Sequence, residues 1–391
     1  MKVNPAAAAM PPSGIREIMN AAWGRDDVLH LEVGQPDFPT PAHIVDAAHE
    51  AARAGHTGYT PTAGIPALRA ALTRKIGERN GFAVEPEQIV LANGGAQAVH
   101  ACLVALTEPG DGILLPDPAW PNFLMMADLL RLDTALYALT PANGYVPEVA
   151  ELEALVTPRT RVLLLNSPSN PLGSVIGRDR MSELLRFAAR HDLWVLSDEC
   201  YDQITFDDTA VSPAALDRDG RVVTVFSFSK TYAMTGWRLG YAAAPPEVAE
   251  VLAKAQEPLI SCVNTPTQYA GLAALDSPPE VLGGMVAAYR QRRDTVVGRL
   301  ASLGMTAFRP SGAFYAWVDV TGTGLGAREF ALRLLAEERV AVAPGTAFGE
   351  RGEGFVRLSL AASERDLAEG CTRLARLWDR LRETAGTAAR R

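Results

Sequence analysis

The chain has 391 residues, of which 48% are hydrophobic, and its formal net charge is −8. This length is sufficient for roughly two or three domains of ~150 residues, and a mildly acidic chain without a basic block is a poor candidate for binding nucleic acid or an anionic membrane. No window of ~18 apolar residues predicts a membrane span. The four cysteines form no C-x-x-C pair, so neither disulfides nor a thiolate metal site are expected.

Residues 1–41 are rich in proline and glycine and predict an irregular N-terminal arm. The alanine run in MKVNPAAAAMPPSG is too short for the apolar part of a signal peptide, and two prolines follow it. We therefore expect a cytoplasmic protein.

From residue 43, short apolar runs alternate with helical patterns such as ALRAALTRKIGERNG (67–81) and RDRMSELLRFAARHD (178–192). The runs are apolar without alternation, which is typical of strands that are buried on both faces. They are IVLAN (89–93), GILLPDP (112–118), RVLLLN (161–166), LWVLSD (193–198) and VVTVFSFS (222–229). Strands that alternate with helices predict an α/β fold with a largely parallel sheet and helices on both sides.

The pattern changes after about residue 278. A long helical stretch (279–302) is followed by AFYAWVDV, another helical stretch, VAVAPG, FVRLSL and a C-terminal helix. This order predicts a smaller α+β unit. The predicted division is an N-terminal arm that contributes to the small domain (1–42), a large domain (43–280) and a small C-terminal domain (281–391).

Polar residues gather where the predicted strands end. They are Asn93 to Gln97, Asn166 to Pro171, Ser197 to Glu199, and Ser227, Ser229 and Lys230. Each group alone is explained by loop or cap chemistry. In open α/β sheets, however, ligands bind beyond the carboxyl ends of the strands. Their shared placement therefore predicts one ligand-binding cleft.

The residue types in this cleft indicate a specific ligand. Gly-Gly-Ala-Gln at a helix start, with Arg238 and two nearby serines, suits a phosphate. Asp198 ends an apolar strand, where a lone carboxylate needs a cation. Lys230, if it is desolvated and close to cations, becomes a nucleophilic amine. A phosphate pocket, a carboxylate that seeks a cation and a nucleophilic lysine together indicate pyridoxal 5'-phosphate.

Three other sequence features could indicate a different kind of site, but each lacks the residues that such a site requires. Ser227-x-x-Lys230 matches the S-x-x-K of penicillin-recognising enzymes, but the companion S-D-N and K-T-G motifs are incomplete. Gly322-x-Gly324-x-x-Ala327 matches a dinucleotide fingerprint but lacks the later acidic residue, so a turn before a helix explains it better. The six histidines show no metal-binding spacing, and no metal is expected.

From about Ser13 to its C-terminal helix, the chain resembles the fold-type I pyridoxal-phosphate enzymes, within the class I/II aminotransferase family that includes aspartate aminotransferases. The most specific match is SFSKTYAMTGWRLGY (227–241). Further motifs are LEVGQPDF (31–38), GYTPTAGIPALR (58–69), NGGAQA (93–98), NSPSNPLG (166–173), SDECYD (197–202), RPSGAFY (309–315) and VRLS (356–359). The resemblance implies a mostly parallel central sheet flanked by helices and a smaller α+β domain.

The resemblance also implies roles at the cofactor. Lys230 matches the Schiff-base lysine, which also moves the substrate proton, and Asp198 matches the partner of the pyridine nitrogen. Tyr201 and Asn170 match the residues that hydrogen-bond the ring's phenolic oxygen, and Trp120 matches the aromatic residue stacked on the ring. The implied phosphate-binding residues are Gly95, Ala96, Gln97, Ser227, Ser229 and Arg238.

For the substrate, Arg357 matches the arginine that binds the α-carboxylate, a task for which its planar fork is suited. Asn170 would share that carboxylate, Trp120 would also contact the substrate, and Gly34 matches a nearby backbone contact. Tyr59 matches a tyrosine that reaches the phosphate of the neighbouring subunit. The resemblance therefore implies a homodimer with shared active sites.

The side-chain pocket departs from aspartate-using members. Some of them have a lysine where this chain has Ala96. The segment PPSGIRE (11–17) matches an N-terminal segment that lines the side-chain pocket in the family, and the resemblance implies Ile15 there. An unpaired carboxylate in an apolar pocket costs several kcal/mol, so we expect donors with neutral or apolar side chains. A one-residue shift of the alignment would place Arg16 there instead and reverse this expectation.

Transamination by a ping-pong mechanism, between an L-amino acid and a 2-oxo acid, is the leading hypothesis. A carbon–sulfur β-lyase, or a lyase like aminocyclopropane-carboxylate synthase, shares the same lysine, aspartate and arginine, and motifs do not separate these reactions. A non-catalytic sensor, such as the aminotransferase-like half of a transcription regulator, would require a DNA-binding domain. The arm of roughly 40 residues is too short and not basic enough for one.

Overall fold

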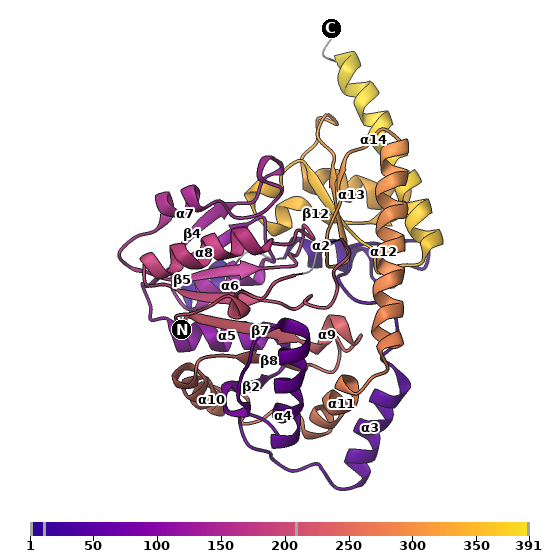
Figure 1. Cartoon of the computed structure of the whole chain (residues 1–391). Helices are drawn as coiled ribbons and strands as arrows, with labels where there is room; N and C mark the ends of the chain where they lie inside the picture. The colour runs from indigo at the N-terminus through magenta and orange to yellow at the C-terminus, as the bar shows by residue number, and fades with distance from the viewer. Residues whose placement is uncertain (1–2, 11–12, 208–209, 389–391) are drawn as a thin grey trace.

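In the computed structural model, residues 3–10, 13–207 and 210–388 are described. The larger sheet of this part of the chain has seven strands in the order β2-β8-β7-β6-β5-β3-β4 (Figure 1). All are parallel except β8, which is antiparallel to both neighbours. The strands are β2 (Ile89–Ala92), β3 (Gly112–Asp117), β4 (Asp133–Ala138), β5 (Thr160–Asn166), β6 (Trp194–Asp198), β7 (Val222–Ser227) and β8 (Gly240–Ala243). The predicted, mostly parallel sheet is confirmed.

Helices cover both faces of this sheet (Figure 1). Along β5, Val162 and Leu164 belong to one hydrophobic cluster, whereas Leu163 and Leu165 belong to another. Successive side chains of a strand point to opposite faces, so both faces are buried, which explains the unbroken apolar runs. The helices are α3 (Ala42–Arg53), α4 (Pro66–Lys75), α5 (Gly94–Leu106), α6 (Asn122–Leu129), α7 (Val149–Leu155), α8 (Arg178–Arg190), α10 (Pro246–Ile260) and α11 (Thr265–Leu275).

The C-terminal part of the chain forms a second, antiparallel sheet in the order β12-β13-β10-β9. Its strands are β9 (Ala307–Phe308), β10 (Tyr315–Asp319), β12 (Ala343–Pro344) and β13 (Phe355–Ser359), and its helices are α12 (Pro279–Ser302), α13 (Ala327–Glu338) and α14 (Glu364–Ala388). The N-terminal strand β1 (Leu29–His30) pairs in parallel with β11 (Val340–Ala341). The N-terminal segment is therefore joined to the C-terminal unit.

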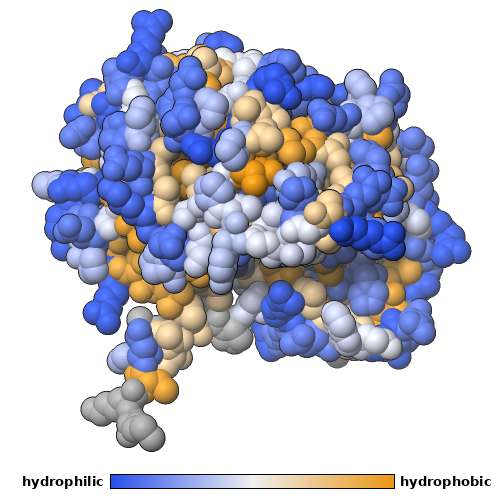
Figure 2. All heavy atoms as spheres, turned by 90° about the horizontal axis from the view of Figure 1, so that it is seen from below, coloured by the Kyte–Doolittle hydropathy of each residue, from blue (hydrophilic) through white to orange (hydrophobic). Residues whose placement is uncertain are grey.

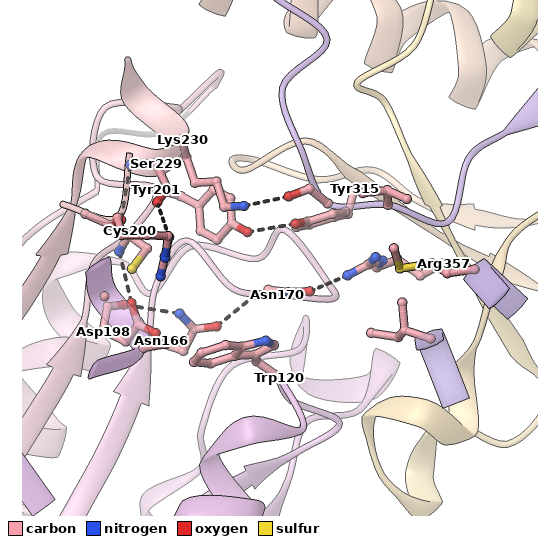
Figure 3. A pocket seen from close by; sticks show the side chains of 18 residues that line it. Trp120, Asn166, Asn170, Asp198, Cys200, Tyr201, Ser229, Lys230, Tyr315 and Arg357 are labelled. Carbon is pink, nitrogen blue, oxygen red and sulfur yellow. Dashed lines mark hydrogen bonds between the residues drawn. The ribbon is translucent and has the colours of Figure 1, made fainter. Parts of the chain in front are cut away.

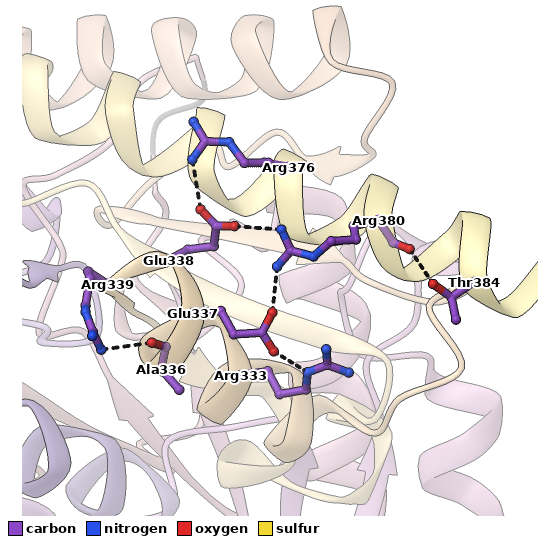
Figure 4. A network of polar contacts seen from close by, with 8 residues as sticks. All are labelled: Arg333, Ala336, Glu337, Glu338, Arg339, Arg376, Arg380 and Thr384. Carbon is purple, nitrogen blue, oxygen red and sulfur yellow. Dashed lines mark hydrogen bonds and ion pairs between the residues drawn. The ribbon is translucent and has the colours of Figure 1, made fainter.

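A charged network fixes α14 against α13 (Figure 4). The Glu338 side chain is buried and accepts hydrogen bonds from Arg376 at 3.0 Å and Arg380 at 3.1 Å. Glu337 beside it accepts from Arg333 at 2.7 Å and from Arg380 at 2.6 Å. A buried carboxylate is tolerated where cations and hydrogen bonds compensate it, and the two arginines of α14 do so here.

The N-terminal arm is more ordered than predicted. It contains α1 (Pro5–Ala9) and α2 (Gly14–Ala22), and the Ser13 hydroxyl accepts a hydrogen bond from the Arg16 backbone N–H at 3.4 Å. The prolines and glycines around residue 12 concealed α2, although Ser13 is a favoured helix-capping residue. Pro11 and Pro12 of the predicted pocket segment lie outside the described residues.

Other differences concern strand and helix limits. The run VVTVFSFS ends as a strand at Ser227, and α9 (Phe228–Thr231) begins directly after it. A π-helical turn, Ile76–Asn80, ends the helical stretch that begins with α4. The strands β4 and β8 were not predicted, because β4 is partly exposed and β8 consists largely of small residues. Gly322 and Gly324 have positive φ angles ahead of α13, as the turn interpretation of that motif predicts.

No helix in the described ranges has the length and apolarity that a membrane span requires.

Candidate active site

A cavity of about 230 Å³ lies at the carboxyl ends of β5, β6 and β7. The larger sheet and its loops supply one side of the cavity, whereas Arg357 and Tyr315 come from the smaller sheet (Figure 3). The N-terminal segment closes it. Its lining residues are Ile15, Met19, Val33, Gly34, Gly95, Ala96, Trp120, Asn166, Asn170, Asp198, Cys200, Tyr201, Ser227, Ser229, Lys230, Tyr315, Arg238 and Arg357.

Lys230 projects into the cavity from α9. Its Nζ donates a hydrogen bond to the backbone carbonyl of Gly34 at 2.5 Å. Burial, together with the positive charges of Arg357 and Arg238, lowers the pKa of Lys230 to about 8. A lysine with a lowered pKa is more often present as the neutral, nucleophilic amine.

Asp198 is the last residue of β6 and is 4% exposed. Its Oδ1 accepts a hydrogen bond from the Cys200 backbone N–H at 3.0 Å. Among the described residues it forms no ion pair, and burial raises the pKa of its carboxyl. Asn166, opposite Asp198 in the register of β5 and β6, donates to the Asp198 carbonyl at 3.2 Å. Asp198 can therefore accept a positively charged group placed in the cavity.

The N-terminus of α5 forms another part of the wall. Gly94 has a φ of +82°, and a Cβ there would lie 2.3 Å from Nη2 of Arg238. A Cβ at Gly95 would lie 2.6 Å from the Cys200 sulfur. Only glycine allows these close approaches. The helix start thus presents backbone N–H groups and a positive dipole end to the cavity, next to a guanidinium.

Arg238 and two serines complete this anion-binding end. The Arg238 guanidinium donates to the Ser229 hydroxyl at 3.4 Å and to the Asn93 carbonyl at 3.3 Å. The Ser227 hydroxyl accepts from the Ser229 backbone N–H at 3.2 Å. Arg238 itself has a φ of +54°, an uncommon conformation for a non-glycine residue. The arrangement is able to hold a phosphate group.

Two predicted residues lie elsewhere in the single chain. The Gln97 side chain accepts from the Asn93 backbone N–H at 3.0 Å and from Gln256 at 3.2 Å, and it is not among the described residues that line the cavity. Tyr59 is 93% exposed. A cofactor contact of Gln97 would therefore involve its backbone, and a contact of Tyr59 would require a second subunit.

Arg357 enters the cavity from β13 and is 2% exposed. Its guanidinium donates to Asn170 Oδ1 at 2.8 Å and to the Glu32 carbonyl at 2.6 Å. The rings of Tyr315 and Phe348 lie 4.2 and 4.7 Å from its Cζ atom. Within the described ranges Arg357 forms no ion pair, and its Nε has no hydrogen-bond partner. A carboxylate can bind here without displacing a competing anion.

The remaining wall is apolar. The Trp120 indole lies edge-on to Phe123, with ring centroids 5.2 Å apart, and faces the cavity (Figure 3). Ile15 and Met19 line the cavity from successive turns of α2. Arg16 between them is exposed, and among the described residues it does not line the cavity.

Sequence reasoning gave no role to five lining residues, namely Met19, Val33, Asn166, Cys200 and Tyr315. Val33, Asn166, Cys200 and Tyr315 belong to the motifs quoted above, which were the available signal. Met19 is four residues after Ile15, so the α2 helix, once recognised, places both on one face. The Tyr315 hydroxyl lies 2.7 Å from the Tyr201 hydroxyl.

Comparisons with known proteins agree with this geometry. Residues 26–374 match the family model described as aminotransferase class I and II. The chain is 39% identical to an aspartate aminotransferase of Pyrococcus abyssi and 37% identical to an aromatic-amino-acid aminotransferase of Thermococcus litoralis, each over 93% of this chain and 95% of the relative. The solved aspartate aminotransferase of Thermus thermophilus with maleate superposes with a TM-score of 0.92 at 36% identity, covering 96% of this chain and all of that one.

Proposed function

Because the chain belongs to the class I and II aminotransferases, which use pyridoxal phosphate, we propose that its amino donor is an L-amino acid with a neutral or apolar side chain. The amino group passes to a 2-oxo acid by a ping-pong mechanism. The observation that carries the proposal is that the apolar residues Ile15, Met19 and Val33 line the same cavity as the buried Arg357. A lyase reaction is not favoured, because the named relatives are aminotransferases.

The cavity fits the cofactor. The α5 N-terminus, Ser227, Ser229 and Arg238 would hold its phosphate, and Asp198 would face its pyridine nitrogen. The Arg238 guanidinium contacts Ser229 and Asn93, and the buried Asp198 carboxylate has no ion-pair partner among the described residues. Both observations support this placement. When bound, pyridoxal phosphate supplies an electron sink for the substrate Cα. Trp120 would stack on its ring, and Tyr201 with Asn170 would hydrogen-bond its ring oxygen.

Lys230 would hold the cofactor and then move the substrate proton. A pKa of about 8 leaves an appreciable fraction of the amine neutral near neutral pH, as a base requires. A general base in the correct position typically accelerates a reaction by ~10²–10⁴-fold. Arg357 would bind the substrate α-carboxylate together with Asn170, which it already contacts at 2.8 Å. The planar guanidinium can bind both carboxylate oxygens at once.

The donor preference follows from what surrounds the substrate side chain. Ala96 stands where some aspartate-using members have lysine, and Arg16 is exposed rather than directed into the cavity. The second carboxylate of aspartate would meet Ile15 and Met19, and an unpaired carboxylate in such surroundings costs several kcal/mol. The relatives include enzymes named for aspartate and for aromatic amino acids, and this wall favours the latter kind of side chain.

A half-reaction tests both parts of the proposal. The loaded protein is mixed with a single amino acid and no oxo acid, and the released oxo acid is quantified. We expect one equivalent per active site, with phenylalanine and leucine reacting faster than aspartate. A faster reaction with aspartate would contradict the donor preference. Continued release of ammonia and oxo acid beyond one equivalent would instead indicate a lyase.

A homodimer is the assembly that we propose. Tyr59 is 93% exposed, and the apolar side chains of Val251 and Leu259 on α10 are 44% and 49% exposed. The face seen from below carries hydrophobic patches between hydrophilic residues (Figure 2). Pairing of two chains would cover apolar surface and would bring Tyr59 of one subunit to the phosphate end of the other site. The cytoplasmic location stays a prediction.

A further inference from the structure

Tyr315 joins two parts of the site that come from different sheets. It opens β10 and is 1% exposed. Its hydroxyl lies 2.7 Å from the Tyr201 hydroxyl, and its ring lies 4.2 Å from the Arg357 guanidinium carbon. Figure 3 shows Tyr315 between Tyr201 and Arg357. One side chain thus touches both the residue proposed for the cofactor's ring oxygen and the residue proposed for the substrate carboxylate.

The position of the Tyr315 hydroxyl is tightly constrained. A Cβ at Gly34 would lie 2.2 Å from the Tyr315 oxygen, so the hydroxyl packs directly against that backbone. The Gly34 carbonyl in turn accepts from Lys230. On the other side, the Phe314 ring packs 5.0 Å from the Tyr315 ring and stacks on Tyr289. The hydroxyl therefore has little freedom to turn away from Tyr201.

The number of available protons decides whether Tyr201 or Tyr315 donates the hydrogen bond between their hydroxyls. Each phenol has a single O–H donor. Burial raises the pKa of both Tyr201 and Tyr315, so both keep their protons near neutral pH. If Tyr201 donates its only proton to the cofactor's ring oxygen, the 2.7 Å contact must be made by the proton of Tyr315. A hydroxyl that accepts one hydrogen bond becomes a stronger donor in the next.

We propose that Tyr315 is a positioning residue that donates its proton to Tyr201, directs the Tyr201 proton at the cofactor's ring oxygen, and holds the Arg357 guanidinium with its ring. This inference rests on the role of Tyr201 in the proposed function. The inference assigns different roles to the hydroxyl and to the ring of Tyr315. The hydroxyl acts on the cofactor through Tyr201, and the ring acts on the substrate carboxylate through Arg357.

The hydroxyl is tested by the pH at which the visible absorbance of the bound cofactor titrates. Hydrogen bonds to an anionic oxygen stabilise the deprotonated form and lower this midpoint. Tyr315→Phe should therefore raise the midpoint, by about half a pH unit, which is a factor of roughly three in the proton equilibrium. Tyr201→Phe should raise it further. The double variant should match Tyr201→Phe alone, because Tyr315 acts through Tyr201.

The ring is tested by a second substitution. Tyr315→Phe keeps a ring beneath Arg357 and should change the KM for the amino donor by less than twofold, whereas Tyr315→Leu should raise KM at least fivefold. Tyr289→Phe is the matched control. The Tyr289 hydroxyl is also buried but has no hydrogen-bond partner among the described residues, so the midpoint and KM should stay at their wild-type values.

The outcomes distinguish this inference from the proposed function. A shift in Tyr201→Phe without one in Tyr315→Phe would overturn the role of the Tyr315 hydroxyl and leave the proposed function standing. Additive shifts in the double variant would show that Tyr315 does not act through Tyr201. No shift in Tyr201→Phe would overturn both the role of Tyr201 and the inference that depends on it. If Tyr315→Phe does not bind the cofactor, the titration midpoint of the cofactor absorbance is measured in Tyr315→Leu instead.

Discussion

Lys230 Nζ donates a hydrogen bond to the backbone carbonyl of Gly34, 196 positions earlier in the sequence, at 2.5 Å. Lys230 follows a strand of the larger sheet, whereas Gly34 lies in the N-terminal segment, whose strand β1 pairs with β11 in a separate two-stranded sheet. The contact therefore joins the larger sheet to the N-terminal segment at the cavity that both residues line. The position of the Lys230 amine therefore depends on the backbone path of the N-terminal segment around Gly34.

Gly34→Ala should impair the enzyme strongly. The added Cβ would lie 2.2 Å from the Tyr315 hydroxyl, so either the segment or Tyr315 must shift. Displacing a reacting group by about 1 Å can cost ~100-fold in rate, and we expect a loss of kcat/KM of that order. Gly298→Ala on α12 is the control, because the added Cβ would meet no heavy atom of the described residues within 4 Å apart from its chain neighbours and the backbone of its own helix. Near-normal kcat/KM in Gly34→Ala would show that the contact is unimportant.

The lowered pKa of Lys230 predicts a pH-dependent cost to folding in the cofactor-free protein. Between the folded-state pKa of about 8 and the ordinary lysine pKa of 10.5, the unfolded chain binds the proton and the folded chain does not. Stability therefore rises with pH across this window, and the cost is fully present below it. Lys230→Met should stabilise the cofactor-free protein at pH 7, by on the order of 1 kcal/mol, and the gain should shrink towards pH 10.

Chemical denaturation at pH 7 and pH 10 measures this gain. Lys254→Met is the control, since this lysine on α10 is 71% exposed, and its removal should change stability little at either pH. A gain for Lys230→Met that is equal at both pH values would show that packing, and not the charge of Lys230, is responsible.

The sequence predicted the larger sheet well because its strands are buried on both faces and read as unbroken apolar runs. β4 was missed because part of it is exposed, and α2 was missed because prolines and glycines precede it. The smaller α+β unit was predicted from the runs AFYAWVDV, VAVAPG and FVRLSL, which contain β10, β12 and β13, whereas β9 was not named because it has only two residues.

The cofactor residues Lys230 and Asp198 could be identified because each breaks a local rule, with a charged group at the end of an apolar strand. Tyr315 and Met19 break no such rule. Tyr315 ends the RPSGAFY motif and Met19 belongs to no quoted motif, and only the fold shows that both reach the cavity. Tyr59 is the opposite case. It is carried over from the family resemblance, and the single chain leaves it exposed.

Ala96→Lys should shift the donor preference towards aspartate. Ala96 lines the same cavity as the apolar wall, so we expect a cation there to pair with the second carboxylate of aspartate. We expect the ratio of kcat/KM for aspartate to that for phenylalanine to rise at least tenfold, about 1.4 kcal/mol. Arg16→Ala should leave the ratio unchanged because Arg16 is exposed. A large change in Arg16→Ala would show that this arginine, despite its exposure, reaches the substrate.

Glu338→Gln should destabilise the C-terminal unit. The carboxylate is 7% exposed and is bound by both Arg376 and Arg380. Its loss should cost about 1–3 kcal/mol, less than for a fully buried pair because the two arginines are partly exposed. Glu250→Gln, which removes an exposed partner of Lys254, should cost under about 0.5 kcal/mol. Equal losses in the two variants, measured by thermal denaturation, would assign no special role to the Glu338 network.

Subunit mixing tests whether Tyr59 completes the site of a neighbouring chain. Lys230→Ala should be nearly inactive, and Tyr59→Phe should bind the cofactor more weakly, by about ten- to a hundredfold, because a hydrogen bond to a charged group contributes ~1.5–3 kcal/mol. In a mixed dimer, one site combines the intact Lys230 of the Tyr59→Phe chain with the intact Tyr59 of the Lys230→Ala chain. At limiting cofactor, the mixture should therefore exceed the summed activities of the separate variants. Activity equal to that sum would place Tyr59 at the site of its own chain or at no site.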